Sequence, residues 1–291
     1  MIVHIHSDDT GNTEHATHRV LSLWLKGVLT GFSIFANGEA TIHLAQTLGG
    51  NAARPARLAC HLNLSEGASC APAYRVPLLA DKHGNLCHTF GSLLKLWLID
   101  RKSLAEQVEI EWRAQIQAVQ RLIQPRTLTT IDSHVHVHML PFLFPIAAKL
   151  AEECRIPSIR IVHEPFFAVR KKDLIAPFYI LNVIKHLVLR ICAFLAIPVA
   201  RHYNLTWPPR MVGVLYSGHM SAEAAMAGIN AAQRKGLDEI EIMFHVGRAT
   251  NDERGRWKDR EFLAQASCSP ERDNEYNEAS RLASMLSQEK A

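Results

Sequence analysis

The sequence has few features that mark a specialised class of protein. Its six cysteines include no Cys-x-x-Cys pair and no spacing typical of a zinc ribbon. The first residues, Met1 to His6, have neither the basic region nor the apolar run of a secretory signal. We therefore expect a reduced, cytoplasmic setting with free thiols. The net charge of +4 is weak and scattered, so no nucleic-acid partner is expected.

Internal repeats, low-complexity tracts and long uninterrupted apolar runs are also lacking. The most apolar stretch, residues 187–200, is interrupted by Arg190 and Pro198 and is too short to cross a bilayer. An arginine inside an apolar run is typical of an interface. We therefore expect a helix that forms a lid, an oligomer contact or a membrane-facing patch. The sequence predicts no transmembrane span, and it leaves open a peripheral membrane contact and a homo-oligomer.

What the sequence does have is the composition of a globular chain and many histidines. Its 291 residues are 48% hydrophobic and 21% charged, which is enough apolar material for a full core. A length of this order is often used by one α/β barrel domain. The sixteen histidines direct attention to metal and proton-transfer chemistry.

Seven short runs, rich in β-branched or aromatic residues, alternate with longer helical stretches. This alternation predicts a mainly parallel sheet with helices packed outside it. We expect an irregular α/β barrel of about seven parallel strands in one domain at residues 1–250, with an open doubly wound sheet as the alternative. Residues 251–291 are expected to form a charged segment with a terminal helix. The predicted strands are residues 2–5, 31–35, 58–62, 129–132, 158–162, 211–215 and 240–244.

Polar side chains follow four of these strands. In parallel α/β proteins the carboxyl ends of the strands meet at one edge, where active sites form. We therefore expect these side chains to share one pocket. They are Asp8 and Asp9 after the first strand, His61 and Asn63 after the third, His134, His136 and His138 after the fourth, and His245 after the seventh.

Each group also has a purely structural interpretation. The two aspartates precede Thr10 and could form a turn and cap before a helix at residues 13–26. His61 taken alone is typical of a core histidine. On an extended strand, His134 and His136 share one face at about 7 Å, and His138 reaches the same ion only if the chain turns.

Two imidazoles and one carboxylate with open positions are a recurrent catalytic arrangement around a divalent ion. Asp9, His61 and His134 would supply this set from three strands. The ion lowers the pKa of a bound water and polarises a carbonyl. Asp8 could then accept the water's proton and His245 could protonate the leaving group. These are the parts needed to hydrolyse an amide or an ester.

Several segments resemble motifs of the YdjC-like carbohydrate deacetylases, a family that includes chitooligosaccharide deacetylases and hopanoid-associated proteins. Residues 132–138, Asp-Ser-His-Val-His-Val-His, follow the family's D-S-H-x-H-V-H, and residues 60–67 are similar to its G-[LM]-H-L-N-L-T-E-G. Residues 6–11 resemble N-A-D-D-F-G, although His-Ser replaces Asn-Ala and Thr replaces Phe. Residues 27–38 resemble a further motif, and residues 243–247 stand where the family has C-H-P-G, although Val246 replaces the proline.

The resemblance implies an irregular β/α barrel that removes an acetyl group from an N-acetylated sugar, whether free, polymeric or lipid-linked. Magnesium is the ion usually assigned in the family, whereas imidazole ligands favour zinc or another transition metal. The identity of the single divalent ion stays open. By motif position, the implied metal ligands are Asp9, His61 and His134, the general base is Asp8, the general acid is His245, and further site residues are His136, His138 and Asn63.

Two other functions remain as alternatives. His4 and His6 also resemble the His-x-His start of the polymerase-and-histidinol-phosphatase phosphoesterases, which would make them ligands of a site with several metal ions. A sugar- or lipid-binding barrel without activity is the other alternative, and the presence of both Asp8 and His245 argues against it.

Overall fold

The computed structural model describes residues 1–208, 210–257 and 260–288, and within these ranges seven strands form one sheet. Every pair of neighbouring strands is parallel. The sheet order is β5-β4-β3-β2-β1-β7-β6. The strands are β1 (Ile2–Thr10), β2 (Gly31–Ile34), β3 (Arg57–Leu62), β4 (Thr130–Ser133), β5 (Ser158–Ile159), β6 (Met211–Val212) and β7 (Glu239–Phe244).

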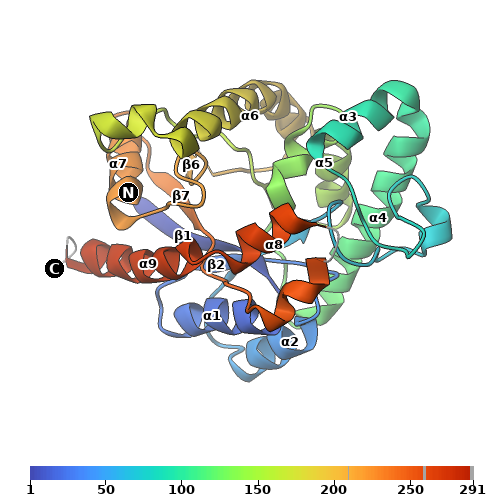
Figure 1. The fold of residues 1–291 in the computed structure, drawn as a ribbon, viewed down its shortest axis with the longest axis horizontal. Coiled ribbons are helices and arrows are strands. Elements are labelled where there is room, and N and C mark those ends of the chain that lie inside the picture. Colours follow the sequence, from blue (N-terminus) through green and yellow to red (C-terminus); the bar gives the residue numbers. More distant parts are fainter. Residues whose placement is uncertain (209, 258–259, 289–291) are drawn as a thin grey trace.

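This strand order is that of a barrel opened at one seam. Strands β1 to β5 lie side by side in chain order, β6 lies beside β7, and β7 lies beside β1. The seam falls between β5 and β6, which do not pair with each other in the described ranges. The seven strands form a curled half-barrel with helices around it, which confirms the predicted irregular barrel (Figure 1). The doubly wound alternative is wrong, because such a sheet reverses its strand order at a switch point.

The helices lie around the sheet, and their starts follow local sequence signals. Thr13 caps α1 through Ala16 N, and Ser221 caps α7 through Ala224 N. Gly236, which ends the α7 region, has the positive φ of 68° that favours glycine. The helices are α1 (Glu14–Leu25), α2 (Thr41–Gly50), α3 (Phe90–Ile99), α4 (Arg101–Leu122), α5 (Phe144–Glu153), α6 (Pro177–His202), α7 (Ala222–Gln233), α8 (Glu261–Cys268) and α9 (Glu271–Gln288).

The two faces of the curled sheet differ in character. Side chains alternate along a strand, so one set points to the helices and the other to the inside of the half-barrel. The outward set is apolar and belongs to the main core, for example Phe32, Leu58 and Ile242. The inward set is polar and buried, and its members contact one another across the strands. It includes His6, Asp8, Ser33, His61, Asp132, Arg160 and Glu241.

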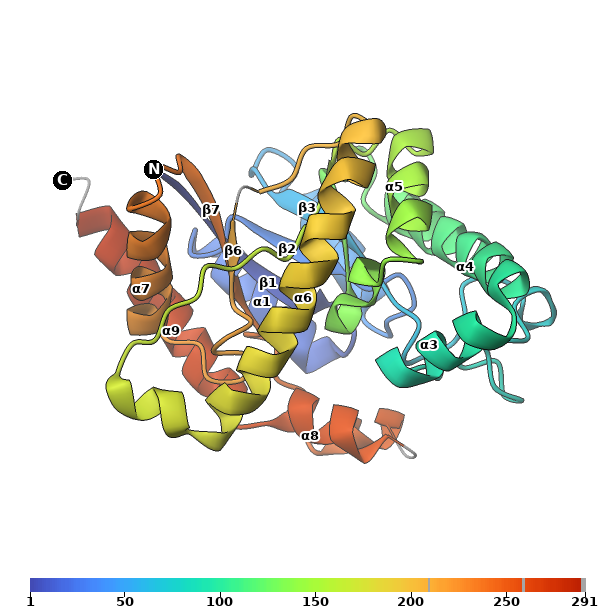
Figure 2. The ribbon, with the colours of Figure 1, turned by 90° about the horizontal axis from the view of Figure 1, so that it is seen from above.

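The apolar helix between β5 and β6 is longer than the sequence argument assumed. Helix α6 has 26 residues and continues through Arg190 and Pro198. Its most apolar 18-residue window has a mean hydropathy of 2.0 and is 33% buried, so by length and composition alone the helix could cross a membrane. The exclusion of a span on length was therefore wrong. Figure 2, which views the molecule from above, shows α6 running across the near face.

Candidate metal centre

The structure brings the three predicted metal ligands together at the carboxyl ends of β1, β3 and β4. Ligand atoms of Asp9, His61 and His134 all lie within 4.8 Å of one another, and the three residues are buried. Asp9 Oδ1 lies 3.4 Å from His61 Nε2 and 3.0 Å from His134 Nδ1. One carboxylate and two imidazoles therefore share a common centre.

The surroundings of these side chains fit a divalent ion. Asp132 Oδ1 lies 2.7 Å from His61 Nδ1, so Nδ1 keeps its proton and Nε2 can coordinate once an ion displaces the other proton. A carboxylate behind a histidine is the usual second partner of a metal-binding imidazole. Among the described residues, the buried atoms His134 Nε2 and Glu66 Oε1 have no hydrogen-bond partner. These two atoms lie 3.1 Å apart as an ion pair without a hydrogen bond, so Glu66 gives the centre a second carboxylate.

A backbone irregularity near the end of β1 directs the side chain of Asp9 toward this centre. Ser7 pairs with Phe32 and Thr10 with Ile34, so β1 has one extra residue relative to β2. Asp9 has a φ of +66°, which is uncommon for a residue other than glycine. Regular alternation would send Asp8 and Asp9 to opposite faces, and the bulge lets both contact inward-facing side chains.

A second irregularity places His134 and separates it from the histidines that follow. Strand β4 ends at Ser133, and His134–Met139 form a 3₁₀ turn with positive φ at Val135 and His136. The expectation that His134 and His136 share one face of a strand is therefore wrong. The turn directs His134 to Asp9, while His138 Nε2 lies 2.8 Å from the carbonyl oxygen of Arg160.

The three additional candidates have different positions. Burial lowers the pKa of His138 to about 4, so His138 is a neutral ring that holds the loop after β5. His136 is buried, and burial lowers its pKa to about 3. Asn63 donates to the carbonyl oxygen of Glu66 at 2.6 Å and accepts from Ser65 N at 2.8 Å. Asn63 thus shapes the turn that carries Glu66 to His134.

Asp8 lies beside the centre in a buried ion pair. Arg160 Nη1 is 3.0 and 2.9 Å from the two carboxylate oxygens of Asp8 and 2.8 Å from Asp132 Oδ2. The guanidinium lowers the pKa of Asp8 despite burial, so the carboxylate is ionised. His6, Asp8 and Asp132 also lie close enough to hold an ion. Arg160 already supplies the positive charge there, so a second metal ion is not required.

The histidines of the phosphoesterase alternative do not meet at the centre. His4 Nε2 lies 2.7 Å from Arg57 Nη1 and 3.0 Å from Glu239 Oε1. Arg57 and Glu239 are the first residues of β3 and β7, so His4 lies at the opposite end of the sheet. The arrangement of His4 and His6 therefore does not favour a site with several metal ions.

His245 follows β7 and is the predicted site residue most open to solvent. Its side chain is 22% exposed. Burial lowers its pKa to about 4, and the nearby Arg272 acts in the same direction. Glu275 accepts a hydrogen bond from the backbone N–H of His245 at 2.5 Å. Burial raises the pKa of Glu275 to about 7.

Several residues that contact the centre were not predicted as site residues. Trp257 Nε1 donates to Glu66 Oε2 at 2.5 Å, and Arg272 Nη2 donates to Asp9 Oδ2 at 2.9 Å. Both come from the segment after residue 250, so this charged segment covers the centre. Glu66 could have been found, because it lies in the motif at residues 60–67. No sequence signal pointed to Arg160 or Arg272.

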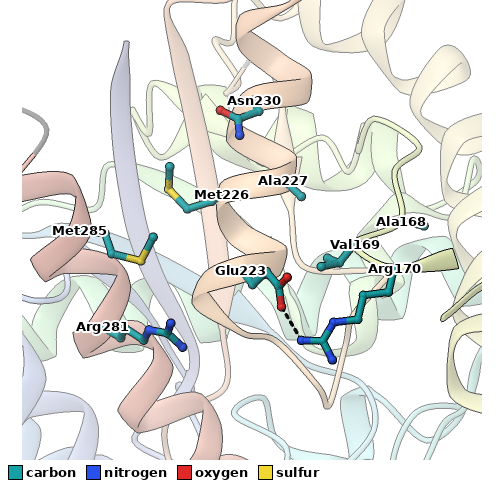
Figure 3. A pocket seen from close by; sticks show the side chains of 9 residues that line it. All are labelled: Ala168, Val169, Arg170, Glu223, Met226, Ala227, Asn230, Arg281 and Met285. Carbon is teal, nitrogen blue, oxygen red and sulfur yellow. Dashed lines mark hydrogen bonds and ion pairs between the residues drawn. The ribbon is translucent and has the colours of Figure 1, made fainter. Parts of the chain in front are cut away.

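The larger of two cavities in the described residues lies away from the candidate metal centre. A cavity of only about 10 Å³ lies beside Asp9 and is lined in part by Trp257 and Arg272. A larger cavity of about 630 Å³ lies between residues 168–170, α7 and α9, where Arg170 and Glu223 form an ion pair of 2.7 Å (Figure 3). The larger cavity contains none of the predicted site residues, so the chemistry of the buried centre defines the candidate site.

Comparison with known proteins gives the family. The model of the YdjC-like protein family matches residues 2–289, so the chain belongs to this family. It is 31% identical over 166 residues to the chitooligosaccharide deacetylase of Escherichia fergusonii, and 31% identical over 157 residues to a carbohydrate deacetylase of Oceanobacillus iheyensis. The alignments cover 56% and 54% of this chain and 60% and 64% of the relatives, less than two thirds of each.

A solved structure shares the fold. It belongs to a protein of Enterococcus faecalis V583 that is provisionally named a cellobiose-phosphate cleavage protein. The TM-score is 0.62 at 20% sequence identity, and the alignment covers 95% of this chain and 94% of that chain. The half-barrel and its connected helices are therefore an arrangement that an experimental structure also shows.

Proposed function

We propose that this protein is a metal-dependent hydrolase that removes an acetyl group from an N-acetylated sugar. The observation that carries the proposal is the buried cluster of Asp9, His61 and His134 at the carboxyl ends of three strands of a β/α half-barrel. The names of the relatives from E. fergusonii and O. iheyensis support an acetylated carbohydrate as the substrate class.

Asp9, His61 and His134 would hold one divalent ion, and Glu66 is near enough to His134 to join them. When bound, the ion supplies Lewis acidity to the acetyl carbonyl and lowers the pKa of a water molecule. Two imidazoles in the donor set favour zinc or another transition metal over magnesium. Asp132 fixes the orientation of His61, so that Nε2 stays directed toward Asp9.

Proton transfer is assigned to Asp8 and His245. Hydrolysis of the amide adds water, forms acetate and releases the sugar amine, so one proton must leave the water and one must reach the amine. Asp8 is ionised and accepts the first proton, while Arg160 and Ser33 hold its carboxylate in place. His245 delivers a proton to the departing nitrogen. Its low pKa means that the ring is neutral near neutral pH, so His245 takes up the proton that Asp8 accepted from the water and passes this proton to the nitrogen.

An acetate-release assay tests the proposal. The purified protein is incubated with N-acetylated sugars that are free, oligomeric or lipid-linked, in the presence of chelator and after addition of zinc or magnesium. We expect release of acetate that chelator abolishes and added metal restores. Phosphate release from phosphoesters with more than one bound ion would support the phosphoesterase alternative. A protein that binds metal and sugar but releases no acetate would be a binding barrel.

A further inference from the structure

One side of α6 is buried in the protein, and the opposite side is exposed and apolar. Tyr179, Asn182 and His186 belong to the buried side, where buried residues recur at spacings of three and four. The exposed residues recur at the same spacings and are 54–66% exposed. They form a surface that we name the outer face of α6, and they are Leu181, Ile184, Leu187, Ile191, Phe194 and Leu195.

Basic side chains border this outer face on both sides. At about 100° per residue, its six members occupy an arc of roughly 140°. Lys185 lies about 40° beyond one edge of the arc, and Arg190 lies about 40° beyond the other. The sequence from 174 to 222 contains no Asp or Glu, and Lys171 and Lys172 are exposed just before the helix. Within this stretch of the chain, the apolar face is therefore flanked by basic residues and by no acidic residue.

From this arrangement we infer that the outer face of α6 docks on an anionic lipid surface. Exposed apolar patches of this kind mark an interaction site. A helix with an apolar face bordered by Lys and Arg is typical of binding at a membrane interface, where the long basic side chains extend to the headgroups. The inference does not rest on the proposed hydrolase activity.

The charge pattern favours lipid over a second copy of the chain. In a two-fold contact, the same patch on both copies faces itself. Two outer faces would then bring Lys185 and Arg190 of one copy near the same residues of the other. No acidic residue of α6 is available to balance them, because the helix contains none. Anionic headgroups would balance all of these charges.

Contacts of the buried side indicate that α6 lies on the membrane and does not cross it. Asn182 Nδ2 donates to the carbonyl oxygens of Leu215 at 3.3 Å and Ser217 at 3.1 Å. A spanning helix would break these bonds and would expose the polar side chains of Asn182 and His186 to hydrocarbon. In Figure 2, α3 lies on the same side of the molecule as α6. Its Leu98 and Ile99 are also exposed.

Vesicle co-sedimentation of the full chain tests the inference with a matched pair of substitutions. Ile191→Glu changes the outer face, and Ile42→Glu changes an isoleucine on α2 that is at least as exposed. The probes are phosphatidylcholine vesicles with and without phosphatidylglycerol, at low and high salt. We expect binding to the anionic vesicles, weaker binding at high salt, and a loss of about 10-fold or more for Ile191→Glu only.

A second pair of variants tests the basic border. Lys185→Gln combined with Arg190→Gln should reduce the preference for anionic vesicles, whereas Arg234→Gln combined with Lys235→Gln at the end of α7 should not. Equal binding by the Ile191 and Ile42 variants, or no vesicle binding by the unaltered chain, would overturn the inference. So would a dimer in sedimentation analysis that Ile191→Glu dissociates, without vesicle binding. Retention of the bound protein after an alkaline carbonate wash would indicate a spanning helix and would also contradict it.

Discussion

Arg272 donates a hydrogen bond to Asp9 across 263 positions of the sequence. Its Nη2 lies 2.9 Å from Asp9 Oδ2, while Nη1 donates to the carbonyl oxygen of Gly247 at 2.7 Å. The other oxygen of Asp9, Oδ1, faces His61 and His134. One carboxylate thus joins the first strand, the candidate metal centre and the last helix.

Replacing Arg272 should therefore affect stability according to metal content. Arg272→Met leaves the buried Asp9 carboxylate without its guanidinium partner, which costs about 3–5 kcal/mol for a buried pair. A bound ion would offset part of this loss by neutralising the same carboxylate. We expect a large drop in the free energy of unfolding for the chelated variant and a smaller drop with metal, measured by urea denaturation. An equal drop in both states would mean that Asp9 does not contact the ion.

Substitution of the two adjacent aspartates should affect different properties, metal content for Asp9 and turnover for Asp8. Asp9→Asn should lose metal, whereas Asp8→Asn should keep metal and lower kcat by about 10²- to 10⁴-fold, the range for a positioned base. Metal content by atomic absorption and acetate release distinguish the two. Equal metal loss in both variants would show that the roles are wrongly assigned, and full activity in Asp8→Asn would remove the proposed base.

Asp132 should control metal affinity without touching the ion. Asp132→Asn replaces the charged acceptor behind His61 Nδ1 with a neutral amide and so weakens the hydrogen bond that fixes the ring. We expect metal affinity to fall about 10- to 100-fold, as for other carboxylate partners of ligating histidines. Isothermal titration with zinc measures the change, and Asp81→Asn in an exposed loop is the control. An unchanged affinity would contradict the proposed ligand role of His61.

The stability of the chelated protein should depend on pH through the titration of His61 and His134. Neighbouring carboxylates raise the pKa of His61 to about 10 and that of His134 to about 9. Both values lie above the ordinary value of 6.5. Protonation therefore stabilises the metal-free fold fully below about pH 6.5. That stability is lost as pH rises through 9 to 10.

Metal should reverse this trend, because it displaces the same protons and binds more tightly as pH rises. Unfolding curves across this pH range, with and without zinc, measure both effects. The double variant His61→Gln, His134→Gln serves as the control and should lose both dependences. A chelated protein whose stability rises toward pH 10 would contradict the prediction.

The sequence was sufficient to predict the strands and the grouping of the three candidate ligands, because each rests on local patterns. All seven predicted strands are present, and Asp9, His61 and His134 meet because the carboxyl ends of parallel strands converge. The main errors arose where the backbone leaves a regular path. The turn after Ser133 could not be deduced from alternating histidines, since the same spacing fits a strand.

Partners that are distant in sequence could not be predicted at all. Arg160 reaches Asp8 over 152 positions, and its pairing depends on where β5 lies in the sheet. The length of α6 was missed for a different reason. Arg190 and Pro198 interrupt an apolar run, but neither interrupts the helix that contains them. Counting consecutive apolar residues therefore underestimated the length of a helix whose buried side is held by tertiary contacts.

The extra residue in β1 makes that strand intolerant of changes in length. Asp8 and Asp9 are chemically identical, and only the local register decides which of them faces Arg160 and which faces the two histidines. Inserting or deleting one residue within Ile2–Thr10 would exchange or expel these carboxylates without altering either side chain. The β1–β7 pairing therefore fixes the positions of Asp8 and Asp9 along the strand. In homologues with this site, insertions and deletions should occur only beyond the position of Thr10.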